Sequence, residues 1–304
     1  LLERYPDSPL LMEGLEWLAR AHLLLGEYTR AAEVLEVAAS LGTVPLEIRH
    51  RARFMKAWTL LRGGLYAQAL EECERLYREA STGPWAPEAL FWAAEAHFQL
   101  RRPDRAAELW GEFLRAFSAH PYALAARYAR AWALFQAARY QEAIPVFRDF
   151  LALYRPSARD LVRYDQDARL RLADSYFALK QYAEAVAAYQ AVIDRGGSEV
   201  DYALFQQALA RYYSNAPSEA IRLLRLLRER YPRSAYVDEA QYQIGWIYFR
   251  LGRYQEAVAE FERLRTESPD SPLAPRALYN IGDAHYNAGR LEQAIAAYEA
   301  LVQQ

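Results

Sequence analysis

The stretch AQYQIGWIYFRLGRYQEAVAEF, residues 240–261, holds two short helical patterns separated by a glycine. In its first half, small and aromatic residues recur at spacings of three and four, which puts them on one helix face: Tyr242, Gly245, Trp246 and Phe249. The second half continues with the same spacing: Tyr254, Ala257, Val258 and Phe261. Between them, Gly252 can adopt the positive φ that ends a helix. The stretch predicts two antiparallel helices, here named helix A and helix B.

This arrangement recurs along all 304 residues. One alanine of each helix B marks the repeat, at spacings of 38, 37, 37, 42, 35, 37 and 37 residues: Ala31, Ala69, Ala106, Ala143, Ala185, Ala220, Ala257 and Ala294. Twelve positions before each lies a small residue of helix A: Ala19, Ala57, Ala94, Ala131, Ala173, Ala208, Gly245 and Gly282. A paired small residue lets two helix backbones approach closely. Self-similarity at this period is the signature of a solenoid, so we expect eight helix pairs in one all-α domain, residues 1–304.

Turn and cap residues predict where these helices begin and end. Helix A is expected to begin near eight positions: Pro9, Glu47, Pro87, Tyr122, Asp165, Val200, Tyr236 and Leu273. The break between helix A and helix B carries a residue that tolerates positive φ in several repeats: Gly26, Gly64, Asn215, Gly252 and Gly289. Ser8–Pro9, Ser234 and Ser271–Pro272 offer capping hydroxyls before helix A.

The small residue in helix A and the tyrosine, alanine and aromatic positions in helix B resemble the tetratricopeptide repeat. Repeat seven carries them as Gly245, Tyr254, Ala257 and Phe261, and repeat five as Ala173, Tyr182, Ala185 and Tyr189. The resemblance covers all eight repeats and implies a right-handed superhelical solenoid. The chain departs from the family in its period, about 37 residues against 34, and where Pro103 and Pro217 replace the tyrosine.

The linkers between repeats carry a finer resemblance. Residues 4–8 (RYPDS), 230–234 (RYPRS) and 268–271 (SPDS) precede helix A, and residues 274–279 read APRALY. These segments are similar to repeats of bacterial cell-envelope proteins such as the outer-membrane assembly lipoprotein BamD and the Tol-Pal coordinator CpoB. The resemblance implies a periplasmic or outer-membrane-associated protein.

Composition argues against several partners. The chain has 37 basic and 39 acidic residues, a net charge of −2, and no charge run that would indicate nucleic-acid binding. No apolar stretch approaches the length of a membrane span. Cys73 is the single cysteine and falls at a helix B position occupied by aromatic rings in other repeats, so we expect a buried thiol.

Two further features concern the regularity and the ends of the solenoid. Pro145 lies beyond the first turn of a helix B, and the linker that follows carries five extra residues, so we expect a kink and a bend near 145–165. Neither end carries a polar capping repeat. We therefore expect the chain to be a fragment of a longer protein and its apolar ends to associate with one another.

Catalytic and metal-binding motifs are not recognisable in the sequence. His22, His97 and His285 occupy the same position of repeats one, three and eight, too far apart to share one zinc ion. The nucleophile-elbow, zinc-protease, P-loop and dinucleotide-binding patterns do not occur. We expect no enzyme activity, no metal and no cofactor.

Helix A supplies the candidate partner-binding groove, because the resemblance implies that helix A lines the concave face. Family positions five and nine, with the rings and carboxylates suited to a partner, give these candidates: Phe54, Trp58, Phe91, Glu95, Tyr128, Trp132, Asp174, Tyr242, Trp246, Tyr279 and Asp283. Rings four residues apart share a helix face, and aromatic residues are enriched where proteins bind partners. The same rings could instead pack against the next repeat. Rings at position twelve, such as Phe98 and Phe135, are assigned to packing.

These observations predict a non-catalytic scaffold that binds a peptide segment or a partner protein. The rival hypothesis is a module that faces carbohydrate in envelope polysaccharide export or cell-wall metabolism, since rings beside carboxylates also suit sugars. Peptide binding should depend on a few aromatic residues and on salt, whereas glycan binding should be insensitive to salt. The solenoids of this family that clamp a carboxylate use lysines that this chain lacks at the required positions.

Overall fold

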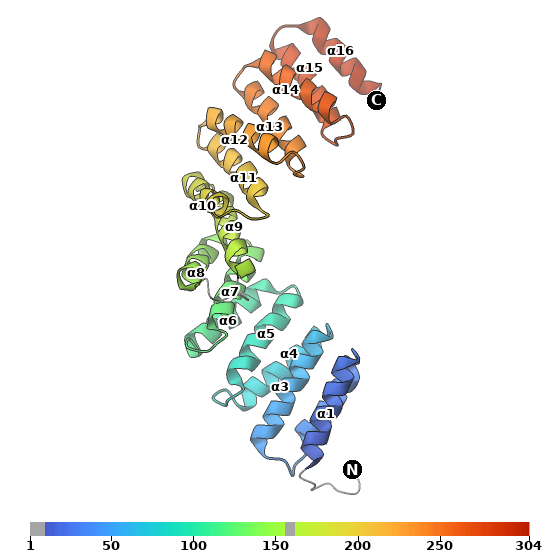
Figure 1. Cartoon of the computed structure of the whole chain (residues 1–304), viewed down its shortest axis with the longest axis vertical. Helices are drawn as coiled ribbons and strands as arrows, with labels where there is room; N and C mark the ends of the chain where they lie inside the picture. The colour runs from blue at the N-terminus through green and yellow to red at the C-terminus, as the bar shows by residue number, and fades with distance from the viewer. Residues whose placement is uncertain (1–9, 156–161, 304) are drawn as a thin grey trace. The chain divides into compact units, whose positions relative to one another are not determined.

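The computed structural model describes residues 10–155 and 162–303, and the side chains of 162 and 163 are not described. Within these residues the chain is all-α, without a β-strand (Figure 1). The helices are α1 (Leu10–Leu24), α2 (Tyr28–Ser40), α3 (Leu46–Arg62), α4 (Tyr66–Glu79), α5 (Ala86–Gln99), α6 (Pro103–Ala116), α7 (Ala123–Gln136), α8 (Tyr140–Leu153), α9 (Val162–Ala178), α10 (Tyr182–Arg195), α11 (Val200–Tyr213), α12 (Pro217–Arg230), α13 (Val237–Arg250), α14 (Tyr254–Glu267), α15 (Ala274–Asn287) and α16 (Leu291–Val302).

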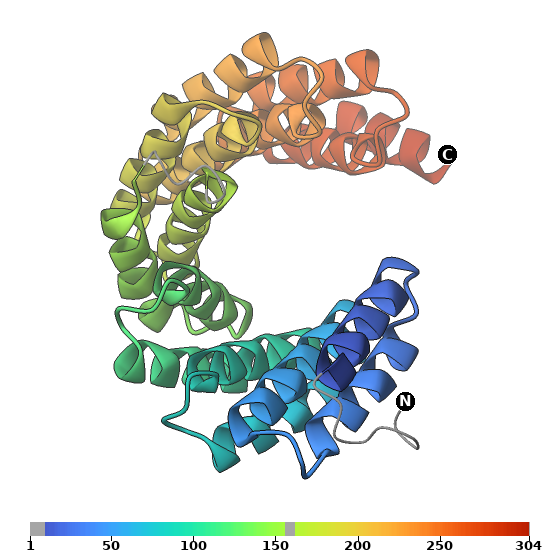
Figure 2. The ribbon, with the colours of Figure 1, turned by 60° about the horizontal axis from the view of Figure 1, so that its bottom comes forward.

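The solenoid of paired helices is confirmed. Odd-numbered helices are the expected helices A, and seven of the eight begin within one residue of the predicted position. The exception is α9, which begins three residues early, at Val162. The chain divides into two compact units, residues 1–164 and 165–304, whose boundary falls in the first turn of α9. Inside each unit the helices form two layers (Figure 2).

The turn between helix A and helix B has one shape throughout. The predicted residues Gly26, Gly64, Asn215, Gly252 and Gly289 all adopt positive φ, between 61° and 76°. In repeats three, four and five the same place holds residues with a Cβ atom: Arg101, Ala138 and Lys180, with φ of 60°, 57° and 59°. The left-handed conformation is costly for such residues. The fold therefore imposes this turn where the local sequence does not favour it.

The small residues of helix A lie where two helices touch. In repeat seven, a Cβ atom added to Gly245 would come within 2.7 Å of the ring of Phe261 on α14. In repeat eight, Gly282 faces Tyr298 in the same way. The corresponding alanines are fully buried in the other repeats, among them Ala57, Ala131 and Ala208. Close backbone approach within each helix pair is thus the physical basis of the sequence period.

The linker serines Ser234 and Ser271 were predicted to cap helix A, but each forms a hydrogen bond in the turn that precedes the helix. The Ser234 hydroxyl accepts a hydrogen bond from the Tyr236 N–H at 3.1 Å and donates to Asp201 at 2.6 Å. Tyr236 is itself the N-cap residue of α13, so Ser234 forms a turn before the helix and does not cap its first N–H groups. Ser271 accepts from the N–H of Leu273 in the same way, at 3.4 Å. The predicted cap Ser8–Pro9 and the linker at residues 4–8 lie outside the described residues.

The junction near Pro145 is described in part. Helix α8 continues through Pro145 from Tyr140 to Leu153, so the proline does not end it. The linker residues 156–161, where the five extra residues fall, lie outside the described residues. The kink and the bend near 145–165 stay predictions.

The outermost described helices expose apolar side chains. Leu10, Trp17 and Leu18 on α1 are exposed, whereas Leu11 and Leu15 are buried against their neighbours. On α16 the exposed apolar residues are Leu291, Ile295 and Val302. These faces are consistent with the expected end association, which stays a prediction.

Candidate partner-binding surface

Four of the predicted groove residues meet in the first unit. Phe91 and Glu95 on α5, with Tyr128 and Trp132 on α7, line a cavity of about 440 Å³. The remaining lining is mostly apolar: Trp92, Phe98, Trp110, Ala125, Ala129 and Tyr164, the last residue of this unit. Phe91 is buried and forms the floor, while Glu95, Tyr128 and Trp132 are half-buried. An apolar hollow with a carboxylate at its edge is typical of a site for an amphipathic ligand.

Ring contacts fix the shape of this cavity, named here the aromatic cavity. The Trp132 ring stacks on Phe135, with centroids 5.5 Å apart and planes at 6°. Phe91 touches Trp92 edge-on and lies 6.2 Å from the ring of Trp110. Trp110 is fully buried behind them. These contacts hold the rings in place, so a ligand would meet a preformed surface and would not have to order it.

Two indole N–H groups at this cavity are buried without a hydrogen-bond partner among the described residues. They are Nε1 of Trp92 and Nε1 of Trp110. A buried donor without a partner costs free energy. Both donors lie below the accessible surface, so they belong to the packing around the cavity and not to its exposed lining.

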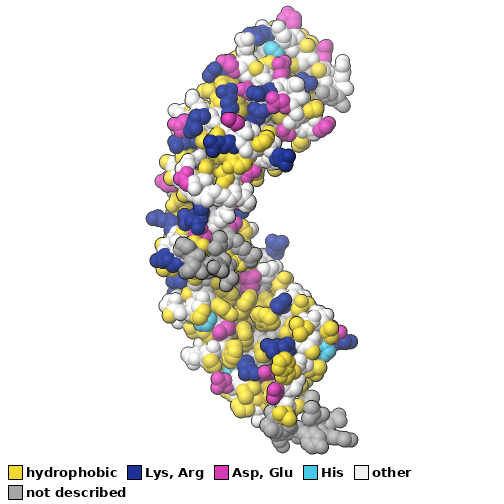
Figure 3. Space-filling view, in the orientation of Figure 1, with side chains coloured by type: hydrophobic (Ala, Val, Ile, Leu, Met, Phe, Trp, Pro, Cys, Tyr) yellow, Lys and Arg dark blue, Asp and Glu magenta, His cyan; other side chains and the backbone are white. Residues whose placement is uncertain are grey.

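The predicted pair Phe54 and Trp58 lies on α3, outside the aromatic cavity. Phe54 stacks on Trp85 at 5.1 Å between centroids, and the guanidinium of Arg62 lies over the ring of Trp58 at 5.1 Å. Both predicted rings are half-buried. They extend the aromatic lining of helix A in this unit. Hydrophobic side chains cover much of the visible face over α3 to α5 (Figure 3).

In the second unit the predicted aromatic residues have separate environments. Tyr242 is buried, accepts a hydrogen bond from Asn280 at 2.6 Å and lies under the guanidinium of Arg276. For Tyr242, the structure therefore favours the packing alternative that the sequence left open. Trp246 stays half-buried and stacks on Phe249, with centroids 5.5 Å apart. Tyr279 is exposed.

The predicted carboxylates of the second unit bind tyrosines. Asp174 accepts hydrogen bonds from Tyr189 at 2.7 Å and Tyr202 at 3.1 Å, and from Arg171 at 2.8 Å. Burial raises the pKa of Asp174, and these three donors partly offset that effect. Asp283 accepts from Tyr298 at 2.7 Å. Asp174 therefore links α9, α10 and α11 as a structural group and has little surface to offer a partner.

Sequence reasoning missed six of the ten described residues that line the aromatic cavity. Trp92 and Ala129 occupy family position six, which also faces the groove, but only positions five and nine were read for candidates. Phe98 was assigned to packing and lines the cavity as well. Position six was the signal that could have found Trp92.

The described residues do not meet the requirements of a reactive thiol, a metal site or a membrane span. Cys73 is fully buried, as predicted, and burial raises the pKa of its thiol. In the described part of the chain no three histidine, cysteine or carboxylate side chains converge to hold a metal ion. No described helix combines the length and the apolar character that crossing a membrane requires.

Family models match most of the chain in pieces. Models described as tetratricopeptide repeat match residues 167–195, 205–272 and 242–304. A model described as anaphase-promoting complex, cyclosome, subunit 3 matches residues 62–150. A search of curated proteins finds no significant match.

Solved structures share the fold at low sequence identity. A tetratricopeptide repeat protein from Cytophaga hutchinsonii, solved as its C-terminal part, is 16% identical with a TM-score of 0.63, covering 82% of this chain and 94% of its own. The apo form of RapI is 14% identical with a TM-score of 0.60, covering 99% and 88%. A tetratricopeptide repeat protein from Parabacteroides merdae is 16% identical with a TM-score of 0.54, covering 84% and 92%. These structures show that the chain shares their fold, and the models described as tetratricopeptide repeat match within residues 167–304.

Proposed function

We propose that this chain is a non-catalytic scaffold that binds a peptide segment or partner protein through its helix A face. The aromatic cavity carries the proposal, because its rings are preformed, partly exposed and bordered by Glu95. The tetratricopeptide fold is consistent with such a role. We further propose a location in the bacterial cell envelope, periplasmic or outer-membrane-associated, on the likeness of the linkers at 230–234 and 268–271 to envelope repeats.

The ligand that suits this cavity is an extended peptide with a large apolar side chain. Tyr128 and Trp132 offer flat apolar area, and Glu95 can accept from a backbone N–H or a basic side chain of the ligand. Gln99 already donates to Glu95 at 2.7 Å, an exposed contact that a ligand could displace.

Peptide selection followed by substitution tests this proposal. Peptides would be selected from a display library on the immobilised 304-residue chain, and their affinities measured by fluorescence anisotropy. Trp132→Ala should weaken binding by about 5- to 1000-fold, equivalent to roughly 1–4 kcal/mol, as truncation of an interface hot spot does. Tyr286→Ala is the control, since Tyr286 is an exposed ring outside the cavity.

The outcomes separate the proposal from its rival. Equal peptide affinity in the wild type and in Trp132→Ala, with unchanged helix content, would remove the aromatic cavity as the binding site. If chitin-derived or peptidoglycan-derived oligosaccharides bind the wild type, if that binding is insensitive to salt, and if no peptide is selected, then the carbohydrate-facing reading replaces the scaffold. Fractionation of cells that express the gene from its natural locus tests the envelope location.

A further inference from the structure

A second hollow in the first unit has a different chemistry. It encloses about 160 Å³ between α6 and α7 and shares no residue with the aromatic cavity. Its lining includes three arginines, Arg115 on α6, Arg130 on α7 and Arg139 in the turn before α8. The volume corresponds to about five water molecules at roughly 30 Å³ each, enough for one tetrahedral oxyanion.

A glycine brings two of these arginines together. A Cβ atom added to Gly111 on α6 would lie 3.2 Å from Nε of Arg130 and 3.6 Å from a terminal guanidinium nitrogen of Arg115. Both guanidinium groups therefore approach the same point above the bare backbone of Gly111. Any larger residue at position 111 would fill part of the space that they surround.

The positive charge at this point is only partly balanced by the protein, because Glu108 is the one carboxylate in the described lining of the hollow. Arg139 is bonded to Glu142 at 2.8 Å and to Asp104 at 3.1 Å, and Glu108 pairs with Arg105 at 2.7 Å. Arg115 and Arg130 form no ion pair with any residue that the structure describes, and Nε of Arg130 is buried without a hydrogen-bond partner. Burial and then the charge of Arg115 lower the pKa of Arg130.

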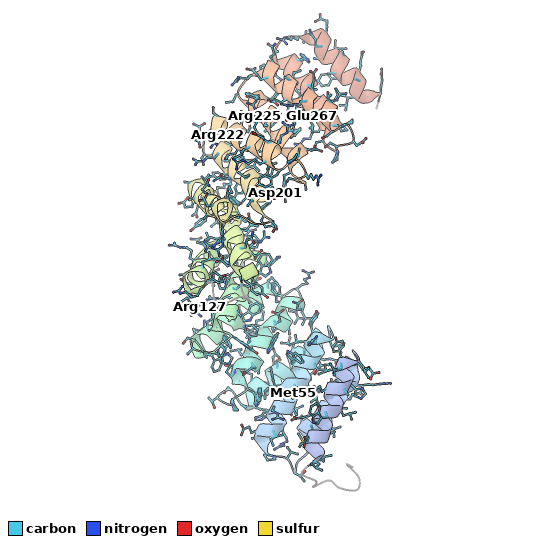
Figure 4. The ribbon with its side chains drawn as sticks, viewed as in Figure 1. Met55, Arg127, Asp201, Arg222, Arg225 and Glu267 are labelled. Atoms are coloured by element: carbon cyan, nitrogen blue, oxygen red, sulfur yellow. The ribbon has the colours of Figure 1, made fainter. Side chains whose placement is uncertain are left out.

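A hollow in the second unit occupies the equivalent place with different side chains. It lies 114 residues later in the repeat register, where Arg253 takes the place of Arg139 and Ile244 the place of Arg130. Two of the three arginines that line it have partners: Arg225 donates to Glu260 at 2.7 Å and Arg253 to Glu256 at 2.8 Å. The third, Arg222, forms no ion pair with a residue that the structure describes. Arg225 lies on α12 (Figure 4).

The counterpart of Arg115 there is the carboxylate Glu229, which also lines the hollow. In the same register, Arg222 takes the place of Glu108, so each hollow is lined by three arginines and one carboxylate among the described residues. What distinguishes the first unit is the pair Arg115 and Arg130 across a glycine, because Arg225 takes the place of Gly111 in the second unit.

We propose that Arg115, Arg130 and the bare backbone of Gly111 form a binding site for a phosphate-class oxyanion. Guanidinium groups present planar forks of donors that match the oxygens of phosphate. An oxyanion in the hollow would accept hydrogen bonds from the guanidinium groups of Arg115 and Arg130 and balance their two like charges. The oxyanion is either free inorganic phosphate or a phosphoryl group carried on a small molecule.

Thermal unfolding of the 304-residue chain tests this site, with inorganic phosphate and O-phosphoserine as probes against chloride at equal ionic strength. A ligand at free concentration L that binds only the folded state stabilises it by RT ln(1 + L/Kd), so the melting temperature rises with the logarithm of the ligand concentration once that concentration exceeds Kd. Both probes should raise it if the hollow admits a carried phosphoryl group, and inorganic phosphate alone if it admits only the free ion. A melting temperature unchanged by either probe overturns the proposal.

Four variants locate the effect. Arg130→Met and Arg115→Gln should weaken the apparent affinity for phosphate at least tenfold. Arg148→Gln, which removes one exposed charge from α8 in the same unit, should keep the wild-type response. Gly111→Ala adds one methyl group to the hollow and favours the helix, so it should weaken phosphate binding without lowering the melting temperature in chloride. An equal phosphate response in the wild type and in all four variants would indicate non-specific screening and refute the site.

Discussion

Replacement of Gly245 by alanine tests the physical basis of the repeat. Gly245 lies in the middle of α13, where alanine is favoured over glycine by about 1 kcal/mol. The new methyl group, however, would lie 2.7 Å from the fully buried ring of Phe261. Phe261 is held against Tyr242, with ring centroids 5.4 Å apart, so it cannot move away freely. Overpacking of this kind costs about 1–3 kcal/mol, and we expect a net destabilisation of about 1 kcal/mol.

A control variant and a compensating second substitution test whether the contact with Phe261 causes the expected destabilisation. Gly14→Ala makes the same chemical change on α1 with no atom within 4 Å of the new methyl group, so it should stabilise the protein by about 0.5–1 kcal/mol. Combining Gly245→Ala with Phe261→Leu recreates the pair Ala208 and Leu224 that repeat six uses at the same two positions. The double-mutant cycle should show a favourable coupling of about 1 kcal/mol.

Urea unfolding followed by circular dichroism gives these free energies, and hydrogen exchange of the α13 and α14 amides localises them. The localisation matters because the stability of a solenoid is a sum over repeats and their interfaces. If Gly245→Ala stabilises the protein as Gly14→Ala does, or if Phe261→Leu has the same effect in both backgrounds, close approach at the small residues does not explain the repeat.

Four further outcomes follow from particular side chains. Cys73, whose thiol pKa is raised by burial, should resist thiol reagents in the native protein at pH 8 and react only after unfolding. Burial lowers the pKa of His97 below its usual 6.5, so the folded protein favours the neutral imidazole. The stability that depends on this neutral form is lost as the pH falls from about 6.5. His97→Gln should therefore flatten the pH dependence of the free energy of unfolding in urea between about pH 7 and pH 5. Ala138 has φ of 57°, so Ala138→Gly should raise the free energy of unfolding by about 1 kcal/mol, whereas a loss would show that the turn carries no strain. Ile295 and Val302 are exposed on α16, and lysine at both positions should abolish concentration-dependent association in sedimentation velocity if that face mediates it.

The sequence alone determined the architecture. The recurrence of Ala257 and its equivalents, each with a small partner twelve residues earlier, fixed eight helix pairs, because only tightly packed helices need small residues at that interval. Glycine and asparagine marked five of the helix breaks for a local reason, their tolerance of positive φ. Ala138 could not be read this way, because packing of the neighbouring helices imposes the turn on it.

Only the tertiary structure decided which side chains are available to a ligand. Tyr128 and Tyr242 occupy the same repeat position, yet the first lines a cavity and the second is buried beneath Asn280. The difference comes from residues about 38 positions away in the next repeat, which a local pattern does not report. The pairing of Arg115 with Arg130 across Gly111 likewise depends on the contact of α6 with α7. Periodicity thus specifies where helices lie, whereas exposure and charge balance depend on side chains that meet only after the helices have packed.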